Sequence, residues 1–281
     1  MLDLRRIVLE SFLTEVNALK PGNVSRHAAG HGMSADDFIL SAELVTPILC
    51  NSQLSLGERI LQGVRSTKQK AGCNTNLGML LLFAPIIMAA EAGVEQNIAA
   101  LQGRLRVVLE SADQANAALI FQAISEASPG GLGQSDKYDV NFSPDCGLLT
   151  AMAAAEKRDL IAKQYVTGFS DIFTTGFGCM QEFSRRWKSV EWATVACYLT
   201  FLSGFADSHI VRKFGHETAE GTRIKAIEIA GQFKKNKNPG NAESVLLEFD
   251  RELKDININP GTSADLTTAS VLVYGLIEQK L

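Results

Sequence analysis

The stretch from Leu77 to Ala90 is apolar on every side of a helix, and it constrains the fold more than any other part of the sequence. A helix without a polar face lies in a protein core or in a membrane. This stretch is shorter than the about 20 apolar residues that a membrane-spanning helix needs. We therefore predict a central buried helix over 77–90, and we expect Pro85 to kink it or to end its first part.

A polar turn, Asn74-Thr75-Asn76, precedes this stretch. Asn74 or Thr75 is suited to cap the helix, because such side chains accept hydrogen bonds from the first free amides. Those amides and the positive end of the helix dipole also make the turn a place to bind an anion. Simple capping of a core helix is the alternative, and this stretch alone favours it.

Helical spacing of apolar residues recurs along the chain, beginning with the segment from Leu4 to Leu19. Convincing alternation with a period of two residues is missing, which argues against a sheet. Val190–Ala206 is again apolar almost all round, so we predict a second central helix there. The pattern predicts a single all-α domain over residues 1–281, a multi-helix bundle with two central buried helices.

Composition excludes several classes of protein. The net charge is −4, so no general basic field for nucleic acid is present. The five cysteines are scattered without a C-x-x-C pair, which is typical of buried thiols in a reducing compartment. Asp3, Arg5 and Arg6 interrupt any apolar run at the start. We therefore expect no signal peptide and no membrane partner, and a cytoplasmic location; homo-oligomerisation is left open.

Four groups of polar residues fall where helices are expected to end, and we predict that they converge on one pocket. The first holds Glu15, Lys20, Asn23, Arg26 and His31, the second Asn74, Thr75 and Asn76, the third Asp136, Tyr138 and Asp139, and the fourth Asp207, His209, Arg212 and Lys213. The third group lies in the longest loop signal of the chain, and long loops in compact domains are often functional.

Two of these carboxylates are expected on apolar helix faces. Glu15 shares a face with Phe12 in the first helix, and Asp207 shares one with Val211 if Val190–Phe214 is a single helix. A carboxylate in such a place needs a partner or a shifted pKa. Beside several cations and a helix N-terminus, two of them suit a phosphorylated ligand with a divalent metal.

Each carboxylate also has a simpler interpretation. Glu15 can pair with Lys20 or Arg26, and Asp207 can pair with Arg212. The sequence contains no Walker A motif, no dinucleotide-binding glycine pattern after a strand and no nucleophile elbow. Residue spacing by itself therefore indicates a helical protein with a candidate pocket for a polyanion.

The same stretches resemble the triphosphoribosyl-dephospho-CoA synthase family. The matching motifs run in the family's order and span nearly the whole chain: Glu15-Val16 with Lys20-Pro21-Gly22-Asn23-Val24-Ser25-Arg26, then Asn74-Thr75-Asn76-Leu77-Gly78, then Asp207-Ser208-His209-Ile210-Val211-Arg212-Lys213-Phe214-Gly215, and finally Asn259-Pro260-Gly261-Thr262-Ser263-Ala264-Asp265-Leu266. The resemblance implies an all-helical enzyme that joins ATP to 3′-dephospho-CoA and releases adenine. The product is the prosthetic-group precursor of the acyl carrier proteins of citrate lyase and malonate decarboxylase.

One motif departs from the citrate-lyase branch of the family. There His-Lys follows the pair equivalent to Asn74-Thr75, whereas Asn76-Leu77 stand in this chain. The chain is similar to the branch found in archaea and in bacteria with archaeal-type one-carbon coenzymes. A different nucleotide-dependent step, in tetrahydromethanopterin or methanofuran biosynthesis, is therefore one alternative. A non-catalytic helical binding protein is another.

The resemblance implies roles for the polar groups. ATP would be a substrate, with Mg²⁺ as the expected metal, and the partners would be small nucleotide and coenzyme molecules. The implied metal ligands or general bases are Glu15 and Asp207, and Asp136 and Asp139 could do either from the long loop. The implied ATP- and substrate-binding residues are Lys20, Gly22, Asn23, Arg26, His31, Asn74, Thr75, Asn76, His209, Arg212 and Lys213. Among them, Lys20, Arg26, Arg212 and Lys213 are the candidates for the triphosphate.

Overall fold

The computed structural model describes residues 3–71, 76–93, 96–131, 133, 135 and 137–281. It is 73% helical, and the described residues contain no strand, which confirms the all-α prediction. Extended pairing among them is limited to two isolated bridges, Ser25 with Ala28 and Gly30 with Met33, in the loop after the first helix. No helix in the described ranges has the length and apolar character needed to cross a membrane.

The helices follow one another along the chain through short connections. Their bounds are α1 Leu4–Asn17, α2 Ala35–Leu49, α3 Leu56–Ala71, α4 Leu77–Glu91, α5 Ile98–Glu110, α6 Gln114–Ala127, α7 Leu148–Ala155, α8 Leu160–Thr167, the π-helical turn η1 Asp171–Gly176, α9 Phe177–Trp187, α10 Val190–Gly204, α11 Ser208–Phe214, α12 His216–Lys235, the 3₁₀ turn η2 Pro239–Ala242, α13 Glu243–Asp255 and α14 Gly261–Glu278.

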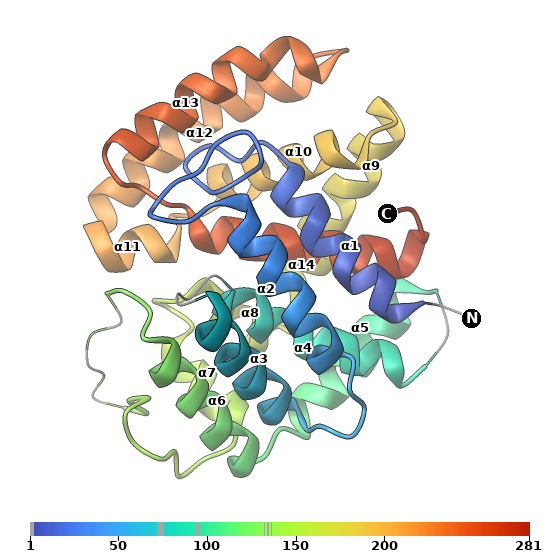
Figure 1. The fold of residues 1–281 in the computed structure, drawn as a ribbon, viewed down its shortest axis with the longest axis vertical. Coiled ribbons are helices and arrows are strands. Elements are labelled where there is room, and N and C mark those ends of the chain that lie inside the picture. The colour runs from blue at the N-terminus through green and yellow to red at the C-terminus, as the bar shows by residue number, and fades with distance from the viewer. Residues whose placement is uncertain (1–2, 72–75, 94–95, 132, 134, 136) are drawn as a thin grey trace.

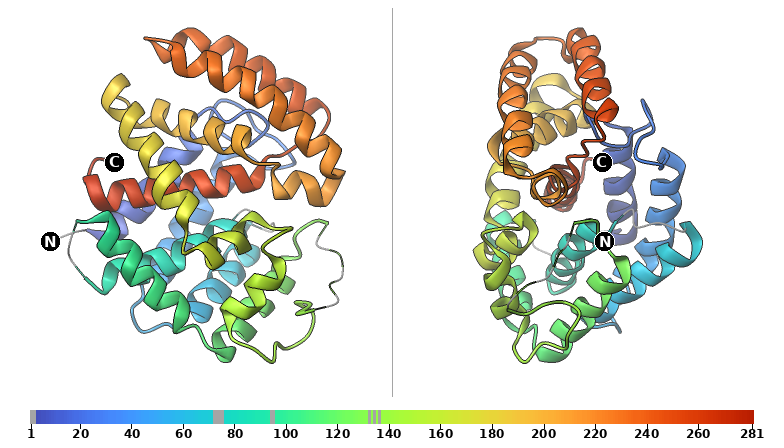
Figure 2. Two further views of the ribbon diagram at one scale, coloured as in Figure 1. Left: turned by 180° about the vertical axis from the view of Figure 1, so that it is seen from behind. Right: turned by 90° about the vertical axis from the view of Figure 1, so that its left-hand side faces the viewer.

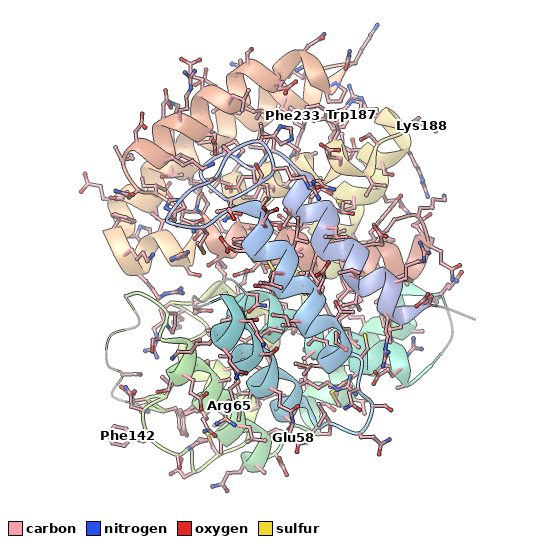
Figure 3. The ribbon with its side chains drawn as sticks, in the orientation of Figure 1. Glu58, Arg65, Phe142, Trp187, Lys188 and Phe233 are labelled. Carbon is pink, nitrogen blue, oxygen red and sulfur yellow. The ribbon has the colours of Figure 1, made fainter. Side chains whose placement is uncertain are left out.

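Helix α14 crosses the middle of the molecule in Figure 1 and in the view from behind in Figure 2. It packs against α1, α4, α10 and the η1 turn. Helices α12 and α13 lie side by side at one end of the molecule, and α3, α6 and α7 lie at the other (Figure 1). Aromatic packing joins α9 to α12, where the ring centroids of Trp187 and Phe233 are 5.1 Å apart (Figure 3).

The two predicted central helices are buried as expected. Almost every residue of α4 is in the core, and α10 is buried from Ala193 to Leu199. Pro85 neither ends nor divides α4, which continues to Glu91. Helix α10, however, stops at Gly204, so Val190–Phe214 is two helices rather than one.

The sequence reading missed α14 as a third central helix. It is buried from Thr262 to Leu276, with Asp265 as the exception. Its many serine and threonine residues make its burial hard to predict, because their hydroxyl groups make the segment look polar. In the structure the hydroxyls of Thr267, Thr268 and Ser270 donate to backbone carbonyls of the preceding turn, as Thr267 does to Ser263 at 2.7 Å, and so they are satisfied within the helix.

Candidate functional site

One cavity of about 450 Å³ opens among α4, α6, α7, α11 and the start of α14. Members of all four polar groups line it, whereas Glu15, Lys20, Arg26 and Asp207 do not. The predicted residues that line it are Asn23, His31, Asn76, Tyr138, Asp139, His209, Arg212 and Lys213. Apolar side chains complete the wall, among them Phe38, Met79, Leu81, Phe121 and Met152. The volume is within the usual range for a small-molecule site.

Helix α11 supplies the cationic side of this cavity. Arg212 donates from Nη1 to Asp159 Oδ2 at 2.9 Å, while its Nε is buried with no hydrogen-bond partner among the described residues. Lys213 is exposed at the cavity. Gly131, at a φ of +75°, lies so close that a Cβ there would come within 2.6 Å of the Arg212 carbonyl oxygen. The loop that contains Gly131 can therefore approach α11 this closely only because residue 131 has no side chain.

Arg158 and Asp159 also line the cavity, and the sequence reading did not single them out. Asp159 caps α8 by accepting from the amides of Ile161 and Ala162, and its other oxygen holds Arg212. Arg158 donates to Ser135 Oγ at 2.9 Å. In the sequence, Arg158 and Asp159 are a charged pair between two short helices. Such a pair is also typical of a solvated connection, so it did not indicate a site.

Asp265 is the other site residue that the sequence reading missed. The spacing of Thr262 and Asp265 in the sequence is typical of a capping box, but α14 begins at Gly261 and has no side-chain cap. Asp265 instead lines the cavity, and no described residue forms a hydrogen bond or an ion pair with it. Burial raises the pKa of Asp265 well above its usual range, the carboxylates of Glu15 and Asp207 raise it further, and Arg212 opposes them.

The two histidines of the cavity are held differently. His31 Nε2 lies 2.8 Å from the Gly22 carbonyl oxygen. Burial, followed by the charges of Lys213 and Arg212, lowers the pKa of His209 to about 3. His209 is therefore neutral at physiological pH and can offer one donor and one acceptor, but no charge.

Two asparagines contribute polar groups to the cavity wall. Asn23 donates to Asn259 Oδ1 at 2.8 Å and keeps its own Oδ1 buried without a partner among the described residues. Asn76 occupies the cap position of α4 without a side-chain capping bond, and its amide donates to Thr67 at 3.0 Å. Both can therefore offer an amide oxygen to a ligand.

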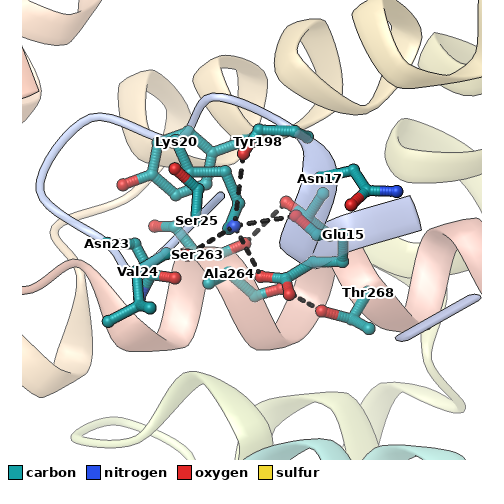
Figure 4. Close-up of polar contacts among 12 residues, drawn as sticks. Glu15, Asn17, Lys20, Asn23, Val24, Ser25, Tyr198, Ser263, Ala264 and Thr268 are labelled. Carbon is teal, nitrogen blue, oxygen red and sulfur yellow. Dashed lines mark hydrogen bonds and ion pairs between the residues drawn. The ribbon is translucent and has the colours of Figure 1, made fainter. Parts of the chain in front are cut away.

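Glu15 and Lys20 form a buried pair outside the lining of this cavity, and both side chains are at most 1% exposed. Lys20 Nζ lies 3.3 Å from Glu15 Oε1 and donates to the carbonyls of Glu15 and Val24 at 2.8 and 2.9 Å (Figure 4). Burial raises the pKa of Glu15 and lowers that of Lys20, and their mutual attraction opposes both shifts. The simpler interpretation of Glu15, pairing with Lys20, is the one found.

A separate cavity of about 10 Å³ touches Glu15 and shares Phe38, Asn76 and Met79 with the large cavity. Such a space holds about one water molecule. Glu15 therefore lies behind the wall of the site, where it influences the electrostatics without facing the main cavity.

Asp207 is buried and accepts hydrogen bonds at the N-terminal ends of two helices. One oxygen accepts from the amides of His209 and Ile210 in α11, and the other accepts from the amide and hydroxyl of Ser263 in α14. Burial raises its pKa, and these hydrogen bonds oppose the shift. Asp207 does not line the cavity, so the structure places both predicted metal ligands behind it.

The remaining predicted residues differ in position. Gly22 turns the chain at a φ of +81° and donates its amide to Asp250, and neither Gly22 nor the exposed Arg26 lines the cavity. Asp139 lines the cavity, and hydrogen bonds from the Asn141 and Ser135 amides lower its pKa. Asn74, Thr75 and Asp136 lie outside the described residues. The described part of the chain contains no cluster of three or more histidine, cysteine or acidic residues able to hold a metal ion.

Comparison with known proteins identifies the family of this chain. A family model described as ATP:dephospho-CoA triphosphoribosyl transferase matches residues 1–281. The crystal structure of a proposed triphosphoribosyl-dephospho-CoA synthase from Archaeoglobus fulgidus is similar, with a TM-score of 0.68 and 24% sequence identity over 86% of this chain and 100% of that chain. At this identity the likeness shows a common fold. No curated protein matches. The chain belongs to the ATP:dephospho-CoA triphosphoribosyl transferase family and is a transferase of coenzyme biosynthesis.

Proposed function

We propose that the large cavity binds ATP and its acceptor and carries out the family's reaction, the transfer of triphosphoribosyl from ATP to 3′-dephospho-CoA with release of adenine. The observation that carries this proposal is that Arg158, Arg212 and Lys213 line the same cavity as Asp265. The reaction needs both cations and a carboxylate, because it must hold a polyanion while it removes a proton from a hydroxyl.

The triphosphate is proposed to lie beside α11. ATP carries about −4 charge at neutral pH, so its site needs cations, backbone donors or a metal. Arg212 has a buried Nε without a partner among the described residues, and Lys213 and Arg158 flank it at the cavity. The first turn of α4 suits an anion less well, since the Asp265 carboxylate lies against Gly78 there. An anion at that turn would meet a negative charge at short range.

The nucleoside parts of both substrates are proposed to lie along the apolar wall. Phe38, Met79, Phe121 and Met152 offer surfaces on which a purine or a coenzyme arm can pack. The buried Oδ1 of Asn23 and the amide of Asn76 are close enough to this wall to orient ribose hydroxyls or a base. This arrangement would exclude water from the ribose carbon while adenine departs.

Mg²⁺ is proposed to enter with ATP rather than to reside in the protein. Glu15 is already paired with Lys20, and Asp207 already accepts from four donors, so neither fits a metal as first expected. Mg²⁺ usually keeps several waters and is held by substrate phosphates with one or two carboxylates. When bound, the ion would neutralise part of the triphosphate charge.

The test is the release of free adenine from ATP by the purified protein. Incubation with 3′-dephospho-CoA should give equal amounts of adenine and of the triphosphoribosylated coenzyme by mass spectrometry. A parallel series with tetrahydromethanopterin and methanofuran precursors examines the alternative acceptors. If adenine is released only with one of those precursors, that precursor is the acceptor in place of 3′-dephospho-CoA. If no acceptor gives adenine, the proposal is contradicted.

A further inference from the structure

We propose that Asp265 is the catalytic base, the group that accepts the proton of the acceptor hydroxyl during transfer. This inference rests on the proposed function of the cavity. It concerns a residue that local sequence pattern assigns to helix capping and that the structure places on the cavity wall.

Asp265 is the carboxylate of this region that no described group engages. Lys20 pairs with Glu15, four donors surround Asp207, and Arg212 holds Asp159. Loop amides occupy Asp139. A base must offer a lone pair to the substrate, and Asp265 is the residue whose oxygens are not committed to a described protein donor.

Gly78 sets the position of this carboxylate. A Cβ built on Gly78 would lie 2.0 Å from Asp265 Oδ2 and 2.5 Å from its Cγ. Any side chain at residue 78 would therefore displace the carboxyl group. Helix α4 presents bare backbone at its first turn, and this lets the carboxyl group of α14 sit between the two helices while facing the cavity. Gly78 is accordingly a positioning residue.

The charges around Asp265 favour proton uptake. Glu15 on α1 and Asp207 before α11 are acidic, and Asp159 before α8 adds a third negative charge. Arg212 on α11 is the opposing cation, and it is partly occupied by Asp159. Together with burial, this surrounding makes the carboxylate a stronger base than an exposed aspartate.

The step balances without an oxidant, a reductant or a further reactant. The acceptor O–H bond breaks and its proton moves to an oxygen of Asp265, while the acceptor oxygen forms a bond to C1′ of the ATP ribose. The C1′–N bond to adenine breaks, its electron pair leaves with adenine, and adenine takes up one proton from water. Asp265 then returns its proton to water, so one acceptor and one ATP give one product and one adenine.

The test compares Asp265→Asn with Asp255→Asn, the same change at an exposed carboxylate on α13. Asp265→Asn should lower kcat for adenine release by about 100-fold or more, the usual contribution of a positioned base. Its ATP affinity by calorimetry should stay within a few-fold of wild type. Wild-type kcat should rise with pH along a carboxylate limb, and that limb should vanish from the residual activity of Asp265→Asn. Asp255→Asn should match wild type in all three measurements.

A second pair of variants keeps the proposal testable if Asp265→Asn folds poorly. Gly78→Ala should lower kcat more than it raises KM, because it displaces the carboxylate. Gly103→Ala on α5, where a Cβ would meet nothing within 4 Å, should leave both unchanged.

Several results would overturn the assignment of Asp265. They are nearly normal kcat in Asp265→Asn, an unchanged pH limb, and a loss that high Mg²⁺ restores, which would indicate a metal ligand. Full kcat in Gly78→Ala would also overturn it. Absence of adenine release by the wild-type protein with every acceptor would overturn the proposed function together with this inference, and so that outcome is distinguishable.

Discussion

Asp207 Oδ2 accepts hydrogen bonds from both the amide and the hydroxyl of Ser263, at 2.7 and 2.8 Å. Its other oxygen caps α11. One buried carboxylate thus joins the N-termini of α11, which carries the cations of the site, and α14, which carries Asp265. The favourable interaction of an anion with two helix N-termini stabilises this junction.

Asp207→Asn is therefore expected to destabilise the fold. The amide group of asparagine would face donors from either α11 or α14, whichever way it turned. Leaving buried donors unsatisfied costs about 2–3 kcal/mol of unfolding free energy. Urea denaturation of Asp207→Asn beside Asp255→Asn measures this. Equal midpoints for the two variants would mean that the junction contributes little.

Lys20→Met is expected to cost more, about 3–5 kcal/mol of unfolding free energy, because it leaves Glu15 buried without its partner. It also removes the donor to the Val24 carbonyl. Lys213→Met, at an exposed lysine of the cavity, should change stability by less than about 0.5 kcal/mol. The opposite pattern, a stable Lys20→Met that loses ATP affinity, would restore Lys20 as a triphosphate ligand.

Asp265 is expected to make the protein less stable as pH rises. Its folded-state pKa is raised, so between the ordinary aspartate value of about 3.9 and that raised pKa the folded protein holds more protons than the unfolded chain. Stability is then greatest below the unfolded pKa and is lost as pH rises through the folded pKa. Asp265→Asn should raise Tm at pH 7–8 but not near pH 4. Parallel Tm curves for variant and wild type would contradict this.

His209 is expected to remain neutral well below pH 6. Its folded-state pKa is lowered to about 3 from an ordinary value of about 6.5. The unfolded chain therefore binds the proton first, and stability that is present above about pH 6.5 is lost as pH falls toward 3. The chain has four histidines, so NMR titration with His209→Gln as an assignment control can follow each ring. A His209 midpoint near 6.5 would show that the ring is not buried as described.

Prediction from sequence succeeded where the signal was local and apolar. The all-round apolar stretches became α4 and α10 because nothing but the core accepts such helices. Helix α14 escaped notice because three of its buried hydroxyls, those of Thr267, Thr268 and Ser270, are satisfied by its own backbone, a pairing that no hydropathy pattern displays. The same ambiguity made Asp265 read as part of a cap.

Polar residues at helix ends could be predicted from the sequence to contribute to a site, but the role of each residue could not. Members of every group reach the cavity, yet the two predicted metal ligands do not: Glu15 pairs with Lys20, and Asp207 accepts hydrogen bonds at the N-termini of two helices. The partner of Asp207 is Ser263, and that of Arg212 is Asp159, each more than fifty residues away in sequence. Such pairings depend on how helices cross, which spacing along one helix does not reveal. Of the pairs weighed from the sequence, Glu15 with Lys20 is the one that the structure shows, whereas Asp207 and Arg212 have other partners.

The claim that this cavity holds ATP is tested most directly by calorimetric titration of ATP, with Mg²⁺ present, into wild type, Arg212→Ala and Arg251→Ala. Arg251 is an exposed arginine on α13 with no described side-chain partner, so it controls for loss of charge alone. We predict that Arg212→Ala weakens binding by about 1.5–3 kcal/mol, the scale of a charge-assisted hydrogen bond, and that Arg251→Ala binds as wild type does. Equal affinity of wild type and Arg212→Ala, or no heat of binding in wild type, would contradict the account.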